Sequence, residues 1–129
     1  MEDDLRTRLL ATSGVSSRTQ VVVWGERPQG SSLPAVVLND VNPGRSYGFF
    51  GPVQLHGSTV QFDIWSLKYG EGLAIFRAIL AEMEQAKSVD DTRFSMSFLE
   101  RKDSSAESIP GVGTVRRISA DFTVWWKAI

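Results

Sequence analysis

Strict alternation of apolar and polar side chains near the end of the chain constrains the fold more than any other feature. Successive residues of a β-strand point to opposite faces of a sheet, so an alternating stretch predicts a strand with one face on a core. Residues 114–127 have this pattern. The apolar positions are Ile118, Ala120, Phe122, Val124 and Trp126, and the opposite positions are Ser119, Asp121, Thr123 and Trp125. The protein is therefore expected to be built around a sheet with one apolar face.

A second alternating stretch lies within residues 56–66 and predicts another strand of the same kind. One face carries Val60, Phe62 and Ile64, and the other carries Gln61, Asp63 and Trp65. Both stretches place a tryptophan and an aspartate on the face that points away from the core. That second face is therefore of functional interest.

Three shorter stretches also predict strands. Residues 19–25 and 35–41 are rich in valine, and residues 94–98 alternate large apolar side chains with serine. Two segments are predicted to be loops because of their composition. Residues 42–54 are rich in glycine and proline and form a long hairpin connection, whereas residues 102–113 are polar and form a mobile hairpin loop.

Two segments have the periodicity of helices. Residues 2–13 begin with acidic side chains, which favour a helix N-terminus, and Gly14 is a plausible stop. The longer helix is predicted over residues 68–87. Its apolar stripe consists of Tyr69, Leu73, Phe76, Leu80 and Met83, and it is widened by Ile75, Ile79 and Ala86.

The order of these elements is helix, three strands, helix and two strands. Short connections between consecutive strands favour hairpins, so the predicted fold class is α+β, with a mostly antiparallel sheet and two helices packed on one face. A length of 129 residues suits one domain, because two smaller domains would each have a poor core.

The composition excludes several classes of function. The chain has no cysteine, which rules out disulfides, thiolate metal sites and cysteine nucleophiles. A net charge of -1 provides no overall attraction for nucleic acid. The single histidine, His56, is interpreted as a hairpin residue and not as a catalytic group or metal ligand. No nucleophile elbow or phosphate-binding loop is present, so neither an enzyme nor a cofactor is expected.

The N-terminus gives no sign of a targeting segment. It is acidic where a signal peptide would be basic, and no run of apolar residues approaches the roughly 20 needed to cross a bilayer. We expect a protein that is made and used in solution, without a membrane partner.

Candidate interface residues follow from apolar or aromatic side chains in unusual places. Phe49 and Phe50 lie at the predicted tip of the connection 42–54, where they either contact a partner or fold back on the core. Ile75 and Ile79 widen the helix stripe, which indicates either a neighbouring subunit or deeper burial within the same domain.

Four further candidates lie on the second sheet face, namely Asp63, Trp65, Asp121 and Trp125. Tryptophan interleaved with polar residues on an open sheet resembles an interface more than a solvent surface. The candidate functional site is therefore a surface for subunits or partners, and the catalytic and metal-binding sets are empty.

The order of several weak motifs along the chain resembles the tail-completion, or tail-terminator, family of long-tailed phages and prophages. The motifs are SLPAVVLNDV (32–41), YGFFGP (47–52), VQFDIWSLKYGEGLAI (60–75) and ISADFTVWW (118–126). The matching residues are Leu33, Pro34, Tyr47, Gly51, Gln61, Asp63, Trp65, Tyr69, Glu71, Asp121, Phe122, Val124 and Trp125. Gly70 and Gly72 depart from the family pattern, because helix formers are expected beside Glu71.

This resemblance implies a structural virion protein of the tail, assembled in the host cytoplasm. Such proteins form hexameric rings that cap the tail tube, stop its polymerisation and offer a docking surface for the head. The implied partners are further copies of the chain, the tail tube protein and a head-completion or connector protein, with DNA passing through the ring without specific binding. Residues 42–54 and 102–113 are the candidates for contacts on the tube or head side.

Three other interpretations remain open from the sequence. One is another neck component, such as a head-completion protein. Another is a small ligand-binding α+β module, which would show an enclosed apolar pocket with converging polar groups. The third is an enzyme, which would show paired carboxylates in a cleft.

Overall fold

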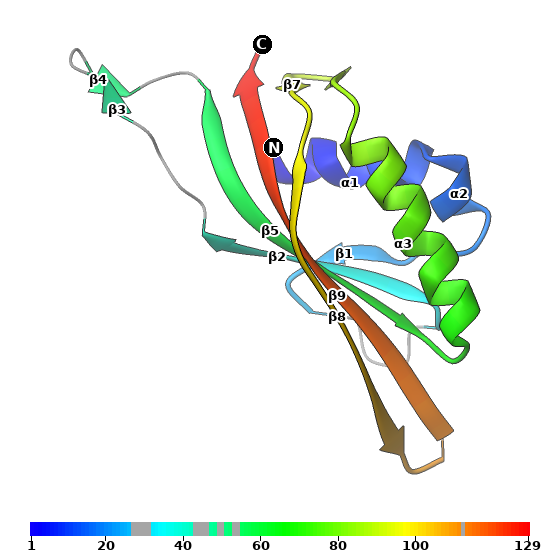
Figure 1. The fold of residues 1–129 in the computed structure, drawn as a ribbon. Helices are drawn as coiled ribbons and strands as arrows, with labels where there is room; N and C mark the ends of the chain where they lie inside the picture. Colours follow the sequence, from blue (N-terminus) through cyan, green and yellow to red (C-terminus); the bar gives the residue numbers. More distant parts are fainter. Residues whose placement is uncertain (27–31, 43–46, 49–50, 53–54, 112) are drawn as a thin grey trace.

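A computed structural model describes residues 1–26, 32–42, 47–48, 51–52, 55–111 and 113–129 (Figure 1). The helices are α1 (Glu2–Ala11), α2 (Ser13–Ser16) and α3 (Tyr69–Met83). The strands are β1 (Val22–Trp24), β2 (Ala35–Asn42), β3 (Tyr47–Gly48), β4 (Gly51–Pro52), β5 (His56–Ser66), β6 (Lys87–Val89), β7 (Thr92–Phe94), β8 (Phe98–Ile109) and β9 (Gly113–Ala128).

One curved sheet contains all of the strands except β3 and β4, which pair with each other. Its strand order is β1-β2-β5-β9-β7-β6, and β8 pairs with the same edge of β9 as β7 does, farther along the strand. The pair β1–β2 is parallel and the other pairs are antiparallel. The fold is therefore mixed α+β, and the predicted mostly antiparallel sheet contains one parallel pair, β1–β2.

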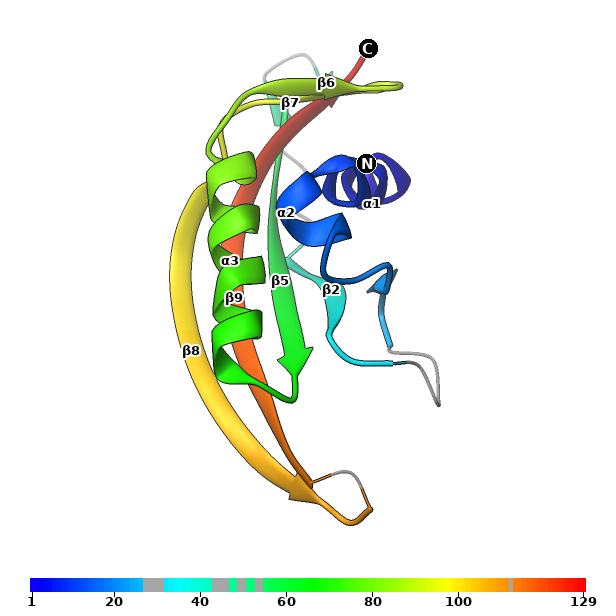
Figure 2. The ribbon, with the colours of Figure 1, turned by 90° about the vertical axis from the view of Figure 1, so that its right-hand side faces the viewer.

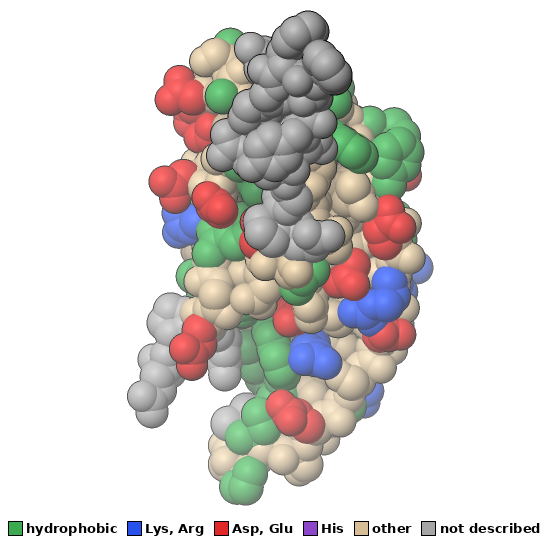
Figure 3. All heavy atoms as spheres, turned by 90° about the vertical axis from the view of Figure 1, so that its left-hand side faces the viewer, with side chains coloured by type: hydrophobic (Ala, Val, Ile, Leu, Met, Phe, Trp, Pro, Cys, Tyr) green, Lys and Arg blue, Asp and Glu red, His purple; other side chains and the backbone are tan. Residues whose placement is uncertain are grey.

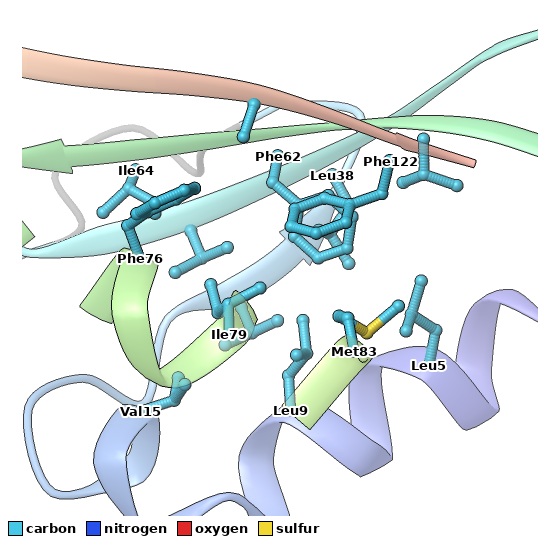
Figure 4. Close-up of a cluster of buried hydrophobic side chains, with 14 of the residues drawn as sticks. Leu5, Leu9, Val15, Leu38, Phe62, Ile64, Phe76, Ile79, Met83 and Phe122 are labelled. Atoms are coloured by element: carbon cyan, nitrogen blue, oxygen red, sulfur yellow. The ribbon is translucent and has the colours of Figure 1, made fainter. Parts of the chain in front are cut away.

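The helices lie on the same side of the sheet, so three described helices cover the face where two were expected (Figures 1 and 2). The alternation in β5 and β9 is confirmed, because their predicted apolar positions point at these helices. The phenylalanines Phe62 and Phe122 meet edge to face, with ring centroids 5.0 Å apart. Around them, α1 contributes Leu5 and Leu9, and Val15, Ile79 and Met83 complete the centre of the core (Figure 4).

The first predicted helix is divided in two. Thr12 has an extended backbone, so α1 ends at Ala11 and α2 begins at Ser13. Gly14 lies inside α2, where a Cβ atom would come 2.6 Å from the Cβ of Ala78 on α3. The predicted stop is therefore a point of close contact between two helices.

The second helix is shorter than predicted and begins at Tyr69 despite the glycines beside Glu71. Gly72 is buried where β5 ends, and a Cβ there would lie 2.7 Å from Oγ of Ser66. A small residue is needed at this position because the helix starts against the sheet.

Two sequence predictions about the last third of the chain are wrong. Residues 94–98 are not one strand, since β7 ends at Phe94 and β8 begins at Phe98. The predicted mobile loop 102–113 belongs largely to β8, which pairs with β9 as far as Ile109 and Gly113. A bulge between Leu99 and Arg101 leaves Glu100 as an extra residue in β8.

The outer part of this hairpin is here called the arm and consists of residues 104–117. Both strands of the arm extend beyond the N-terminal end of α3 (Figure 2). Every residue of β8 from Phe98 to Ser108 is exposed, so the polar composition of the segment reflects solvent on both faces.

Candidate assembly surface

The face of the sheet opposite the helices is here called the open face. In Figure 3 hydrophobic side chains appear in its lower half, between acidic and basic ones. The strand registers place the side chains of Asp63 and Trp65 from β5 and of Asp121 and Trp125 from β9 on this face. The structure thus brings four of the predicted interface residues onto one surface.

The centre of the open face is a polar network. Gln61 Nε2 donates to Asp63 Oδ1 at 3.1 Å and to Ser119 Oγ at 3.1 Å. Asp63 is only 7% exposed and Ser119 only 3%. These groups are therefore held in place by neighbouring strands and are shielded from water before any partner binds.

Arg101 of β8 extends this network toward the sheet edge. Its Nε donates to Asp121 Oδ2 at 3.1 Å, and its guanidinium also pairs with Asp103. The other oxygen of Asp121, Oδ1, is shielded from solvent and has no hydrogen-bond partner in the described part of the chain. A shielded acceptor without a partner is uncommon in a complete interior. Asp121 Oδ1 therefore remains able to accept a hydrogen bond.

Trp65 lies at one end of the open face, beside a hollow of about 300 Å³. The Arg117 guanidinium is 5.4 Å from the Trp65 ring centroid, within the range of a cation–π contact. The hollow combines apolar and acidic groups, and it is lined by Gly25, Glu26, Val37, Asn39, Asp63, Trp65, Glu107, Ile109 and Val115.

Trp125 lies at the other end, next to Gly57 of the adjacent strand. A Cβ atom at Gly57 would come 2.6 Å from the Trp125 ring. The Trp125 ring therefore occupies the space that a side chain at position 57 would fill, and Trp125 is half-buried. Phe98 of β8 lies opposite Thr123 of β9 and is 49% exposed.

The remaining predicted interface residues have different outcomes. Ile75 and Ile79 are fully buried in the core of the chain itself, so the widened helix stripe reflects internal packing and not a subunit contact. Phe49 and Phe50 lie outside the described residues. The predicted interface did not include Arg101 and Glu107, which join this surface through the pairing of β8 with β9. It also did not include Arg117, which lies opposite Trp65 in the pairing of β5 with β9.

The side chains that could bind a metal ion or act in catalysis do not form a cluster in the described part of the chain. In the described part of the chain, no three His, Cys, Asp or Glu residues gather as a metal site. His56 instead lies against Trp126, with ring centroids 4.5 Å apart. Among the described helices, none has the length and apolar character to cross a bilayer.

An aromatic, partly covered sheet face is typical of proteins that assemble with other proteins. Residues 3–127 match the family model of tail completion protein gp17. The chain therefore belongs to the tail completion protein gp17 family, and the resemblance seen in the sequence is confirmed. It is a structural protein of the phage tail and not an enzyme.

A chain in the solved structure of a virion has a similar fold. A chain of a structure titled "Virion of native gene transfer agent (GTA) particle" superposes with a TM-score of 0.69 at 13% sequence identity. The match covers 98% of this chain and 94% of the other. Among curated proteins, none matches this chain.

Proposed function

We propose that this protein is a tail terminator, which assembles into a homohexameric ring at the end of the tail tube. The ring stops tube polymerisation and offers a surface to which a head-completion or connector protein docks. Membership of the tail completion family supports a role at the tail end. The likeness to a chain of a gene transfer agent virion supports a fold that is suited to such a particle.

The observation that carries the proposal is that the open face is only partly covered by its own chain. Its centre is held by hydrogen bonds between shielded polar groups, while an unpaired carboxylate oxygen and two half-exposed tryptophans lie around that centre. Interfaces are enriched in tryptophan and arginine at their energetic centres. A protein partner would cover the rings and give Asp121 its missing donor.

The charge of the chain suits a ring that surrounds DNA. Each phosphate that a lysine or arginine neutralises strengthens binding, so a channel with little positive charge lets DNA slide. The net charge of -1 per chain accords with such a channel. A strongly positive lumen in a hexamer structure would contradict this part of the proposal.

Two measurements test the proposal together. The first is light scattering coupled to size-exclusion chromatography over a range of concentrations, with negative-stain imaging of large species. We expect six-membered rings, either of the chain alone or at the ends of added tail tubes. The second is the length of tubes polymerised from purified tube protein with and without this chain.

The expected result of the second measurement is shorter tubes that end in a ring. Tubes of unchanged length, with no density added at their ends, would overturn the terminator proposal. Rings that bind purified head connectors but ignore tubes would instead indicate another neck component. Either result would leave membership of the tail completion family intact.

A further inference from the structure

We infer that the arm is the contact between neighbouring subunits, with its open-face side in one copy packed against its helix side in the next. This inference rests on the proposed ring and specifies which surfaces would join. The occupant of each side is a second copy of the same chain.

The two sides of the arm carry hollows that lie back to back. On the open-face side, a hollow of about 210 Å³ is lined by Trp65, Ser105, Ala106, Glu107, Val115 and Arg117. On the helix side, a hollow of about 240 Å³ is lined by Tyr69, Ser104, Ser105, Ala106 and Arg116. The shared residues 105–106 show that one thin ribbon separates the two hollows.

The β8 strand of the arm gains little from the rest of its own chain apart from its pairing with β9. Residues 104–108 of β8 are exposed on both faces, and an isolated two-stranded hairpin is at best marginally stable in water. A ribbon of this kind is stabilised when neighbouring layers cover both of its faces. Copies that stack arm against arm would provide those layers.

The charges of the two sides are opposite. Glu26, Asp63 and Glu107 line the hollows of the open-face side, where the only described cation is Arg117, stacked on Trp65. On the helix side, exposed Arg116 lines the hollow with Tyr69, and exposed Lys68 directly precedes Tyr69 in the sequence. The acidic residue nearest to Tyr69 in the sequence is Glu71, in the first turn of α3. Coulomb attraction therefore favours contact between unlike sides and opposes contact between like sides.

Contact between unlike surfaces has a geometric consequence. A head-to-tail contact leaves one free side on each end of a growing oligomer, so it propagates until the rotation closes a ring. Contact between like sides would stop at a dimer, and here it would bring like charges together. The arm thus has the polarity that a cyclic assembly requires.

Each side also offers an aromatic ring to the contact. Trp65 borders the acidic hollow, and Tyr69 is 41% exposed beside Leu67, which is 50% exposed. Exposed apolar groups next to a cation are suited to a hollow with apolar walls and acidic edges. The chemistry of the two sides therefore matches in apolar character as well as in charge.

Charge reversal on one side at a time tests this inference. Glu107→Lys places positive charge on the acidic side, and Arg116→Glu places negative charge on the basic side. Both residues are exposed and make no ion pair or hydrogen bond with another described side chain, so the fold should be kept. We expect each variant alone to associate roughly tenfold or more weakly than the wild type, as judged by sedimentation.

The decisive result comes from mixing the two variants. The unchanged basic side of Glu107→Lys meets the unchanged acidic side of Arg116→Glu, and the two reversed sides also attract each other. Equimolar mixing should therefore restore rings in which the variants alternate. Such alternation is possible because six is an even number. Native mass spectrometry would show three copies of each.

Glu84→Lys is the matched control, because it reverses the same kind of exposed charge at the opposite end of α3. It should assemble like the wild type. Variants that form rings as well as the wild type, or single variants that fail and are not rescued by mixing, would overturn the arm contact while the ring proposal stands. A wild type that forms no ring, alone or on tubes, would overturn both.

Discussion

Arg8 is a charged side chain in the interior of the molecule, with only 1% of its surface exposed. Its Nε donates to Glu82 Oε1 at 2.9 Å, and its Nη2 donates to the backbone oxygen of Gln85 at 2.8 Å. The guanidinium also lies 5.3 Å from the Phe94 ring centroid. One residue of α1 thus binds a side chain of the last turn of α3 and a backbone carbonyl group just after that helix.

Replacing Arg8 with methionine should lower the free energy of unfolding by about 3 kcal/mol. The reason is that Glu82, whose side chain is only 13% exposed, would keep only Lys87 as an ion-pair partner. Urea unfolding followed by circular dichroism measures the change. Arg18→Met is the control, because Arg18 is exposed and its guanidinium donates to the backbone oxygen of Gly14, four residues earlier. Equal effects of the two substitutions would refute this role for Arg8.

Trp65 tests the open face at the level of one side chain. Trp65→Ala should weaken assembly more than it changes the secondary structure of the monomer, because the ring is half-exposed and borders the acidic hollow. Light scattering and far-ultraviolet circular dichroism provide the two readouts.

The matched control for Trp65 is Trp126→Ala. Trp126 points to the helix side of the sheet and donates to Ser58 Oγ at 3.2 Å, so its loss should destabilise the monomer itself. A Trp65 variant that loses folding and assembly to the same degree would place Trp65 in the core instead.

At the scale of elements, the contact between α2 and α3 depends on one glycine. Gly14→Ala would put two Cβ atoms within 2.6 Å, so the helices would have to separate, at a cost of about 1–3 kcal/mol. Adding Ala78→Gly removes the second Cβ and should recover part of the loss, despite the cost of glycine within a helix. A double-mutant cycle based on thermal unfolding measures the coupling. Additive effects would show that the two positions do not clash.

The sequence predicted the strands and helices that have one face buried in the core. It did not predict the part of β8 that has both faces in solvent. Strands β5 and β9 and helix α3 were found because hydrophobic periodicity records burial within the chain. The outer half of β8 has solvent on both sides, so its polar residues 102–108 were predicted to be a loop. Ile75 and Ile79 were candidates for a subunit contact but are buried in the core. Periodicity shows that a helix face is covered, but it does not show whether the cover is the same chain or another one.

At the scale of the whole molecule, the candidate surface was only partly predictable. Alternation placed Asp63, Trp65, Asp121 and Trp125 on a common face, and the structure confirms this placement. The partner of Asp121, Arg101, comes from β8, whose alignment with β9 depends on a bulge and a hairpin. No local pattern in the sequence encodes that alignment, so Arg101 was not predicted to be part of the surface.

The bulge at Glu100 has a consequence for symmetry. A bulge bends its strand and increases the local twist, so this extra residue helps to set the direction in which the arm leaves the body. If arms join neighbouring copies, that direction fixes the rotation from each subunit to the next. A small change in the bend would alter the number of subunits per turn, or turn a closed circle into an open spiral. The bend of this one strand would then determine how many subunits form the ring.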